Sequence, residues 1–354
     1  MSRQIAIDVV NLRPTPRPAH TEYLDHTALI REVSGSDDAR TQESRRALYD
    51  AWDYDLLWST NDGPVKWSQR GRVTDMGHAE YAENGTDRRD TVTCPFEDAR
   101  EVLAFDAVEE YGLPLFDELV RHYEQAYTTR SAQFPNQVNT GGYYKSVMSG
   151  AIQAFGWEML LLAAADADRF ARVLASFADL TLHHVKAWCE TSIEVFIQHD
   201  DFVWTEGPFM APAFYRHAII PHYKRFWDTL HAAGKKVLFC SDGRWDMFMD
   251  DIAAAGADGF IFEPCNPFAD VVRRFGRTHC LVGSAVDCRT MTFGTWAQVQ
   301  AEMDATFALT DRCAGLMWAV GNHLPSNIPL PIMRRYMAYL QRNWQCTPAC
   351  VAAG

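Results

Sequence analysis

The sequence predicts a (β/α)₈ TIM barrel of the α/β class with an N-terminal helical extension. Three observations predict it. Short apolar runs typical of strands recur at a regular cadence in the second half of the chain, amphipathic helical stretches separate most of them, and the runs end in reactive polar side chains. Strand, helix and strand in this order indicate parallel strands joined by helical crossovers. A doubly wound sheet is the main competing architecture.

The first 60 residues have helical character. Small and apolar side chains recur at helical spacing at Ser44, Leu48, Ala51, Trp52 and Leu56. We therefore expect residues 1–60 to form a helical lead-in packed on the barrel. Residues 61–346 are expected to form the barrel as a single domain.

Five runs rich in β-branched and aromatic residues are expected to be strands of the barrel. They are IEVFIQ at 193–198, KVLFC at 236–240, GFIFE at 259–263, CLVGS at 280–284 and GLMWAVG at 315–321. Amphipathic stretches such as 212–234 lie between them and are expected to be the crossover helices. A long helical segment at 146–190 precedes the first run.

Composition bounds the class of protein. With 354 residues and 47% hydrophobic residues, the chain can bury a substantial core. The net charge of -13 and the lack of a Lys/Arg stripe argue against a nucleic-acid partner. Nine scattered cysteines fit reduced thiols better than a disulfide scaffold. Because we find no signal peptide and no long uncharged apolar run, we expect a cytoplasmic protein with no membrane partner.

Reactive side chains follow the expected strands one after another. In a parallel barrel the carboxyl ends of all strands open at one mouth, which is where the active sites of this fold lie. The residues at these ends are His199, Asp200 and Asp201, then Cys240 and Asp242, then Glu263 and Cys265, then Asp287 and Cys288, and finally His323. Each alone is explained by capping, turn formation or packing, but five consecutive ends favour an active site.

Cys240, Asp242 and His323 are three possible metal ligands. Because alternate residues of a strand point to the same face, Cys240 and Asp242 can both aim into the mouth. Three protein ligands with one open position are typical of a catalytic Zn²⁺. In the alternative interpretation Asp242 caps a helix, Cys240 packs, and His323 bonds a substrate directly.

Further candidates for substrate binding lie on the adjoining loops. His78 and the aromatic pair Tyr143 and Tyr144 are candidates to line a pocket, although ordinary loop and core aromatics explain them as well. The remaining candidates are His199, Glu206, Glu263 and Asp287. Of the two acids after His199, we expect Asp201 to face the pocket and to be catalytic, together with Asp242 and His323.

At these residues the chain resembles the uroporphyrinogen decarboxylase-like superfamily of (β/α)₈ barrels. The resemblance is spread over most of the chain, and its most specific parts are the segments 199–243 and 282–295. It also includes DMGH at 75–78, CPFEDAREVLAFD at 94–106, GAIQAFGWEMLLLA at 150–163, GADGFIFEP at 256–264 and GNHLPSNIP at 321–329. The family contains porphyrinogen decarboxylases and methyltransferases that pass methyl groups between corrinoid proteins and thiols.

The resemblance favours the methyltransferase branch. The decarboxylases carry an N-terminal Arg-rich motif that binds substrate carboxylates, and this chain has no such run. The thiol methyltransferases hold Zn²⁺ with a His-x-Cys pair and a later Cys. The corresponding positions here are Cys240, Asp242 and His323, so the resemblance implies a harder, oxygen-richer site or no metal. It also implies that any corrinoid is carried by a separate partner protein.

Three functions are therefore open at the level of sequence. The leading one is transfer of a methyl group from a methylated small molecule or a corrinoid carrier to a thiol or other acceptor, assisted by Zn²⁺. The alternative is a cofactor-free decarboxylase or lyase acting on a small carboxylated or cyclic substrate, in which Asp201 or Asp242 stabilises a protonated ring and His323 anchors a carboxylate. A binding protein without catalysis is disfavoured because so many ionisable groups lie at the mouth.

Overall fold

The computed structural model describes residues 2–24, 26–65, 80–81, 87–88, 94–283, 285–321 and 323–344. Its centre is a sheet of seven strands in the order β1-β12-β11-β10-β9-β8-β7, with every neighbouring pair parallel. The strands are β1 (Ala19–His20), β7 (Gly141–Tyr143), β8 (Val195–His199), β9 (Lys236–Ser241), β10 (Gly259–Phe262), β11 (Cys280–Gly283) and β12 (Gly315–Trp318).

The gap between β1 and β7 is bridged by a short pair of strands. Strand β3 (Leu56–Leu57) pairs in parallel with β6 (Val138–Asn139), which runs on into β7. The amide of Asp55 donates to the carbonyl of His20 at 2.9 Å, and the amide of Val138 donates to the carbonyl of Asp55 at 2.8 Å. These two bonds connect β1, β3 and β6 across the gap in the sheet. The parallel central sheet with helices outside it agrees with the predicted (β/α)₈ fold class.

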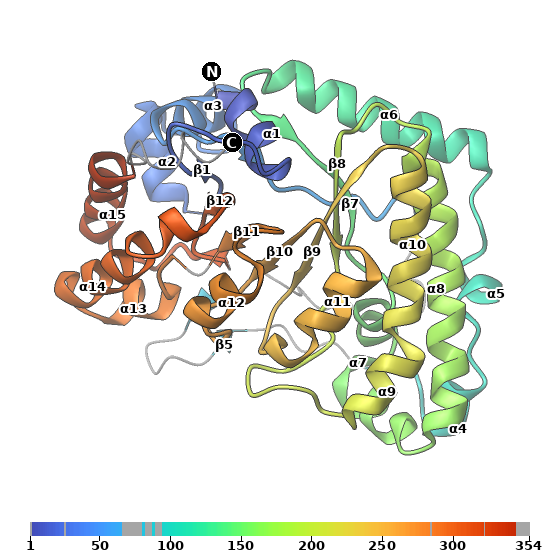
Figure 1. Cartoon of the computed structure of the whole chain (residues 1–354). Helices are drawn as coiled ribbons and strands as arrows, with labels where there is room; N and C mark the ends of the chain where they lie inside the picture. Colours follow the sequence, from blue (N-terminus) through green and yellow to red (C-terminus); the bar gives the residue numbers. More distant parts are fainter. Residues whose placement is uncertain are drawn as a thin grey trace.

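The helices form the outer layer of the barrel (Figure 1). In Figure 1, α8 and α10 stand side by side at the right, and α14 and α15 cover the left. The helices in chain order are α1 (Ser2–Val10), α2 (Thr27–Ser34), α3 (Gln42–Ala51), α4 (Ala99–Leu103), α5 (Ala107–Tyr111), α6 (Phe116–Gln133), α7 (Met148–Ala164), α8 (Ala167–Cys189), α9 (Pro212–Ala218), α10 (Ile220–Ala232), α11 (Met249–Ala255), α12 (Phe268–Phe275), α13 (Cys288–Phe293), α14 (Trp296–Phe307) and α15 (Leu330–Asn343).

Local sequence explains several helix boundaries. Thr295 and Gln298 form a capping box that starts α14, because each side chain bonds the backbone amide of the other. Pro212 occupies the first turn of α9, where its missing amide costs nothing. Gly256 ends α11 in the left-handed conformation with φ of 114°. Helices α8, α10, α11 and α12 each directly precede the next strand of the central sheet.

The inside of the barrel is apolar at its amino-terminal end. Buried side chains of every second strand position meet there in one cluster that includes Val195, Leu238, Ile261 and Met317. Helix α1 closes this end, because its residues Ala6, Val9 and Val10 belong to the same cluster. The opposite end, to which the strands run, is therefore the open one.

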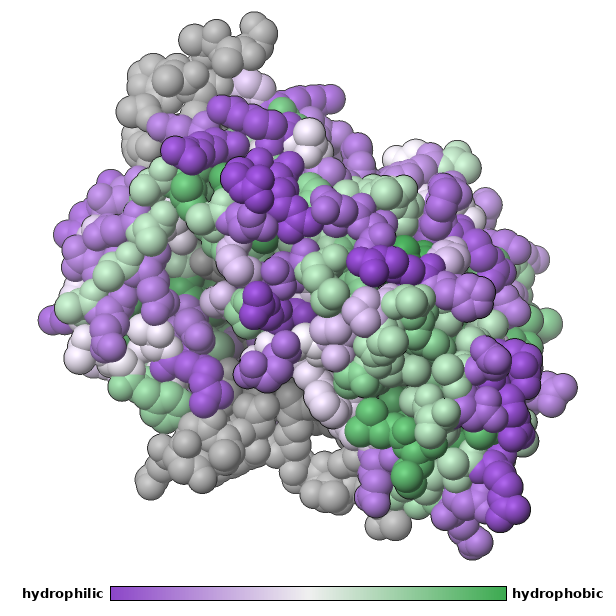
Figure 2. All heavy atoms as spheres, turned by 60° about the horizontal axis from the view of Figure 1, so that its bottom comes forward, coloured by the Kyte–Doolittle hydropathy of each residue, from purple (hydrophilic) through white to green (hydrophobic). Residues whose placement is uncertain are grey.

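Figure 2 brings this open end forward from the bottom of Figure 1. Its surface is hydrophilic over much of the upper part, and a hydrophobic area lies at the lower right, on the side of α7 and α9. Helix α7 is apolar along most of its length, and its Leu162 is 56% exposed. No helix of the described residues is long and apolar enough to cross a membrane.

The first 60 residues supply more than helices. They contain α1, α2 and α3, and also the barrel strands β1 and β3 and the short strand β2 (Tyr23–Leu24), which pairs with β13 (His323–Leu324). A hairpin of β4 (Glu80–Tyr81) and β5 (Asp87–Arg88) follows. The division of the chain at residue 60 stays a prediction, and its proposed end at 346 lies outside the described residues.

Candidate functional site

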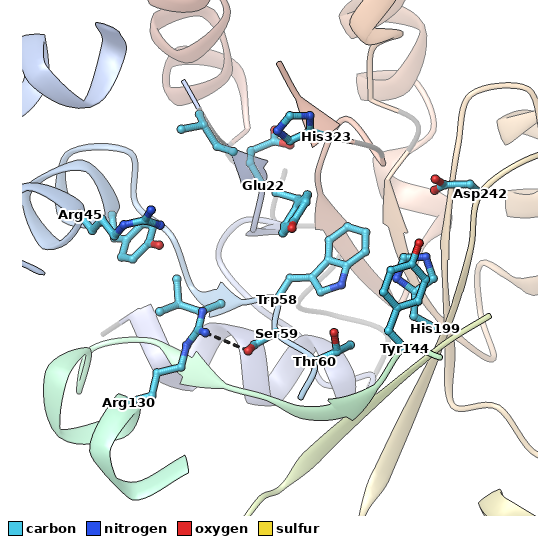
Figure 3. A pocket seen from close by; sticks show the side chains of 14 residues that line it. Glu22, Arg45, Trp58, Ser59, Thr60, Arg130, Tyr144, His199, Asp242 and His323 are labelled. Atoms are coloured by element: carbon cyan, nitrogen blue, oxygen red, sulfur yellow. Dashed lines mark hydrogen bonds between the residues drawn. The ribbon is translucent and has the colours of Figure 1, made fainter. Parts of the chain in front are cut away.

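A cavity of about 280 Å³ opens at the carboxyl ends of the strands. Figure 3 shows it between two walls, with His199, Tyr144 and Asp242 on one side, Arg45 and Arg130 on the other, and Trp58 between them. The lining residues are Glu22, Tyr23, Leu24, Arg45, Tyr49, Leu57, Trp58, Ser59, Thr60, Arg130, Tyr144, His199, Asp242 and His323. Its size suits a small molecule about as large as a substituted ring.

His199, at the end of β8, is held by its neighbours on two sides. Its Nε2 donates to Asp201 Oδ1 at 2.9 Å, and its ring stacks on that of Tyr144 with the centroids 4.0 Å apart. The Tyr144 hydroxyl donates to Asp201 Oδ2 at 2.8 Å. The imidazole therefore has a fixed orientation at the cavity wall, as a general acid or base requires.

Asp201 lies behind this wall and is charged. Burial by itself raises its pKa, but His199, the Asp242 amide and the Tyr144 hydroxyl together hold the pKa below its usual range. The Asp242 amide donates to Asp201 Oδ1 at 3.0 Å, and the Asp201 amide donates to Ser149 Oγ at 2.7 Å. The carboxylate of Asp201 thus links the ends of β8 and β9 and orients the imidazole of His199.

Tyr144 keeps its proton. Burial raises the pKa of its hydroxyl well above the ordinary value, and the charges of Asp201 and Asp242 raise it further. Its amide donates to Asp62 Oδ1 at 2.7 Å, which fixes the loop after β7. Tyr144 is therefore a hydrogen-bond donor and a flat wall, not a base.

The adjacent Asp200 has a different task. Its carboxylate accepts the amides of Val147, Met148 and Ser149 and the hydroxyl of Tyr223, at 2.6 to 3.1 Å. It caps the N-terminus of α7 from a neighbouring strand end. Of the two acids after His199, Asp201 is the one that contacts residues of the cavity wall.

One group of side chains in the described part of the chain has the spacing of a metal site. It consists of His199, Asp201 and Asp242, which each offer a ligand atom within 4.8 Å of the others. An imidazole and two carboxylates are a hard, oxygen-rich donor set that suits divalent cations. The residues therefore fit a metal ion, although both oxygens of Asp201 already accept hydrogen bonds.

Cys240 does not reach this group. It is 1% exposed and packs inside the barrel with Leu238, Ile261 and Val282. Burial raises the pKa of its thiol well above the ordinary value, and the charges of Asp242, Asp201 and Glu263 raise it further. In the described structure Cys240 therefore has the environment of a packed, protonated thiol. Metal binding by Cys240 stays an untested prediction.

His323 lines the cavity from another direction. It is buried in β13, beside Tyr23, with the two ring centroids 5.5 Å apart. In Figure 3 it lies next to Glu22 at the top of the cavity, away from His199. His323 and Asp242 share one cavity, but His323 is not in the group with metal-site spacing.

The other predicted site residues lie off the cavity. Tyr143 is fully buried in the core, because neighbouring strand residues point to opposite faces. Glu206 is exposed, Glu263 accepts the Gly243 amide, and Asp287 caps α13 by accepting the Arg289 amide. His78 lies outside the described residues. Their roles in binding stay predictions.

The sequence prediction missed one wall of the cavity. Arg45 on α3, Trp58 and Ser59 after β3, and Arg130 on α6 all line it. A signal was present, because the run DLLW at 55–58 is apolar and ends at a serine and a threonine. The sequence prediction places this run in the helical extension.

Fold and site together define an enzyme-like (β/α)₈ barrel with ionisable groups gathered at its open end. The family model of uroporphyrinogen decarboxylase (URO-D) matches residues 97–342. The chain therefore belongs to the uroporphyrinogen decarboxylase family. This confirms the superfamily expected from the sequence. The comparison with curated proteins gives no match.

One solved structure superposes on nearly the whole chain, and two others match it more weakly. A methyltransferase from Methanosarcina mazei superposes with a TM-score of 0.67 at 13% identity, covering 96% of this chain and 98% of that one. A xylanase 10B from Thermotoga maritima follows with a TM-score of 0.39 at 10% identity, covering 95% and 98%. A D-psicose 3-epimerase from Clostridium cellulolyticum H10 has a TM-score of 0.36 at 11% identity, covering 65% and 88%. The similarity to the methyltransferase supports the fold of the whole chain. At 13% identity it does not show a shared activity.

Proposed function

We propose that this protein is a methyltransferase that removes a methyl group from a small molecule bound in the cavity. The acceptor is a thiol or a corrinoid carried by a separate protein. The observation that carries the proposal is the network of His199, Asp201 and Tyr144, which is complete, buried and open to a cavity of small-molecule size. The family and the fold of a methyltransferase support it.

The proposed reaction is a nucleophilic displacement at the methyl carbon. The bond between this carbon and its oxygen or nitrogen breaks, and a new bond forms to the acceptor, a thiolate or a reduced corrinoid. The leaving atom keeps the electron pair and takes a proton. His199 is placed to supply that proton, because Asp201 orients its ring and balances the charge.

His199, Asp201 and Asp242 are the residues that would hold a metal ion such as Zn²⁺. A bound cation would supply Lewis-acid polarisation of the leaving atom in place of the proton from His199, because a ring nitrogen that holds a metal cannot also donate a proton. Tyr144 stacks on the ring of His199 and excludes water from it. Asp201 accepts the Asp242 amide and so joins the ends of β8 and β9.

A carbon-carbon lyase without a cofactor is the second candidate. The observation that favours it is that the hydrogen bonds of Asp201 are satisfied within the protein. In a lyase His199 would move a proton to or from carbon, and no methyl group would reach an acceptor.

The two functions separate in one assay. Purified protein is incubated with substrates labelled with ¹³C in the methyl group, such as 4-methoxybenzoate and N-methylated amino acids, and with reduced cobalamin or a thiol as acceptor. Transfer appears as a new ¹³C methyl signal on the acceptor. Loss of substrate carboxylate without such a signal would sink the methyltransferase and favour the lyase. Metal content is measured on the same sample.

A further inference from the structure

The wall opposite His199 carries two guanidinium groups. Figure 3 shows Arg45 on α3 and Arg130 on α6 at one side of the cavity, with Asp242 at the other. Both arginines also line a second, adjoining cavity of about 850 Å³, so they stand where the two spaces meet. The cavity therefore has a cationic end and an anionic end.

Arg130 is incompletely satisfied. Its Nη1 donates to Ser59 Oγ at 2.8 Å, whereas its Nε is buried and has no hydrogen-bond acceptor. Burial lowers the pKa of this guanidinium, and the nearby charge of Arg45 acts in the same direction. In the described structure neither arginine has a carboxylate partner in an ion pair. Arg130 is half-buried, and its Nε is fully buried. A desolvated guanidinium without a counter-ion is costly, so this arrangement points to a ligand.

Glu22 does not supply the missing charge. Its carboxylate accepts the amide of Val320 at 2.9 Å and the hydroxyl of Tyr336. Figure 3 shows it at the top of the cavity beside His323. Among the described residues, Glu22 and the other carboxylates form no ion pair with Arg45 or Arg130.

We propose that Arg45, Arg130 and Ser59 form an oxyanion subsite that binds the carboxylate or phosphate of the substrate. Guanidinium groups match oxyanions with paired hydrogen bonds, and the hydroxyl of Ser59 adds a third polar contact. The oxyanion subsite adds a substrate class to the proposed function. It rests on that proposal only because it takes the cavity to be the substrate site. The substrate is then a small methylated acid, with its anionic end at the arginines and its methyl end at His199.

The aromatic residues between the two ends fit this substrate class. Trp58 lies between the walls, with its ring centroid 6.2 Å from that of His199 and 5.6 Å from that of Tyr23. A flat or methylated body packs against such rings, so the charged end points to the arginines. The geometry therefore orders the substrate along the cavity.

Calorimetric titration of the full chain tests the subsite with three matched probes. They are 4-methoxybenzoate, its neutral amide 4-methoxybenzamide, and 4-methoxyphenyl phosphate. We expect at least one of the two acids to bind about 10-fold or more tightly than the amide, because hydrogen bonds to a charged group are lost with the amide. The acid that binds more tightly identifies the anion. Equal binding of acids and amide, or no binding of either acid, overturns the proposal.

Variants locate the effect. Arg130→Gln and Arg45→Gln are expected to weaken acid binding about 10-fold or more and to leave the amide unchanged. Arg45 is only half-buried, so its variant stays informative if the Arg130 variant fails to fold. Arg121→Gln is the matched control, because Arg121 lies on the same helix but is exposed beside Glu118. An Arg121 variant that loses acid binding as strongly as the other two also overturns the proposal.

The same titration separates this inference from the proposed function. Binding needs no acceptor and no methyl transfer, and Asp201→Asn is expected to keep acid binding. If the wild-type protein binds the acids but transfers no methyl group, only the proposed methyltransferase function is wrong. If it transfers methyl groups without binding acids more tightly than the amide, only the proposed oxyanion subsite is wrong.

Discussion

Among single residues, substitution of Asp201 distinguishes a catalytic role of its carboxylate from a purely structural one. Its carboxylate holds His199, Tyr144 and the end of β9. We expect Asp201→Asn to lower turnover about 100-fold or more, because general acid-base catalysis contributes factors of this size. The expected change in unfolding temperature is small, since an amide keeps the shape. A fall in stability as large as the fall in turnover would mean that Asp201 only ties down the loop.

Asp228→Asn is the control for this measurement. Asp228 pairs with Lys224 on the exposed face of α10, far along the chain from the network. Exposed pairs of this kind contribute little to stability. We therefore expect turnover and unfolding temperature of this variant to equal those of the wild type.

Cys240 tests the interpretation of the strand end. Because it packs among apolar side chains, Cys240→Ala is expected to cost about 1 kcal/mol of unfolding free energy. Turnover and metal content are expected to stay within about twofold of the wild type, since the cavity wall does not include this residue. Chemical denaturation and metal analysis measure both. Loss of bound metal in the Cys240→Ala variant would support the metal site that the sequence predicts, with Cys240, Asp242 and His323 as ligands.

Substitution of Arg130 is expected to keep or raise the unfolding temperature, whereas substitution of Cys240 lowers the unfolding free energy. Its charge is buried without a carboxylate partner, so Arg130→Met removes a cost while keeping the apolar stem. We expect the unfolding temperature of the ligand-free variant to be equal to or above that of the wild type. A drop of several degrees in differential scanning calorimetry would show that Arg130 stabilises the fold.

At the scale of elements, Asp258 joins α10 to β9. It accepts the amide of Val237 at 2.9 Å, Lys236 Nζ at 2.8 Å and His231 Nε2 at 2.9 Å. Burial opposes its charge, but these partners hold the pKa of Asp258 below its usual value. Its stabilising effect is therefore present above about pH 4 and disappears as pH falls through the lowered pKa.

We expect Asp258→Asn to lower the unfolding free energy at pH 7 by about 1 to 2 kcal/mol, the range of a charge-assisted hydrogen bond. The difference from the wild type should shrink at pH 3, which is below the ordinary value of 3.8, because the unfolded chain then takes up a proton at this carboxyl. Urea denaturation at the two pH values measures it. An equal difference at both pH values would contradict the proposed charge.

The elements also show which parts of the fold were predictable. The five runs from 193 to 321 became β8 to β12, with boundaries close to those expected, because each is a buried strand of four to six residues. Strands β1, β3 and β6 have two residues each, so an apolar run such as 55–58 shows too few alternating positions to distinguish a strand from a helix. The wall with Trp58 and Ser59 was missed for this reason.

The site was predicted in part for a related reason. Residues two apart on a strand share a face, so Cys240 and Asp242 do point the same way. They differ in depth, however. Asp242 reaches the cavity, whereas Cys240 lies one layer deeper among apolar side chains. Periodicity fixes the face of a strand residue, but the depth depends on how neighbouring strands are staggered.

For the whole molecule, one buried histidine is expected to make the free energy of unfolding depend on pH in the acid range. Nδ1 of His184 on α8 shares a hydrogen bond with the hydroxyl of Tyr123 at 2.7 Å. Burial, with the nearby charges of His183 and His122, lowers the pKa of His184 from 6.5 to about 3. The unfolded chain therefore binds a proton between these values that the folded chain does not. Stability is full above pH 6.5 and falls as pH drops toward 3.

We expect one proton in this window to contribute a slope of about 1.4 kcal/mol per pH unit. His184→Gln should remove that slope, although it lowers stability at pH 7 through the weaker bond to Tyr123. Unfolding free energies measured between pH 4 and 6 decide this. An unchanged slope in the variant would contradict a neutral, buried His184.

We propose above that the cavity between His199 and Arg130 binds a methylated acid and that its methyl group is transferred. This is tested by ¹³C NMR of the labelled acid that binds most tightly, mixed with wild-type protein and reduced cobalamin. We expect a methyl signal on the acceptor, reduced about 100-fold or more in Asp201→Asn and unchanged in Asp228→Asn. No methyl transfer from a tightly bound acid, or equal rates for wild type and Asp201→Asn, would contradict it.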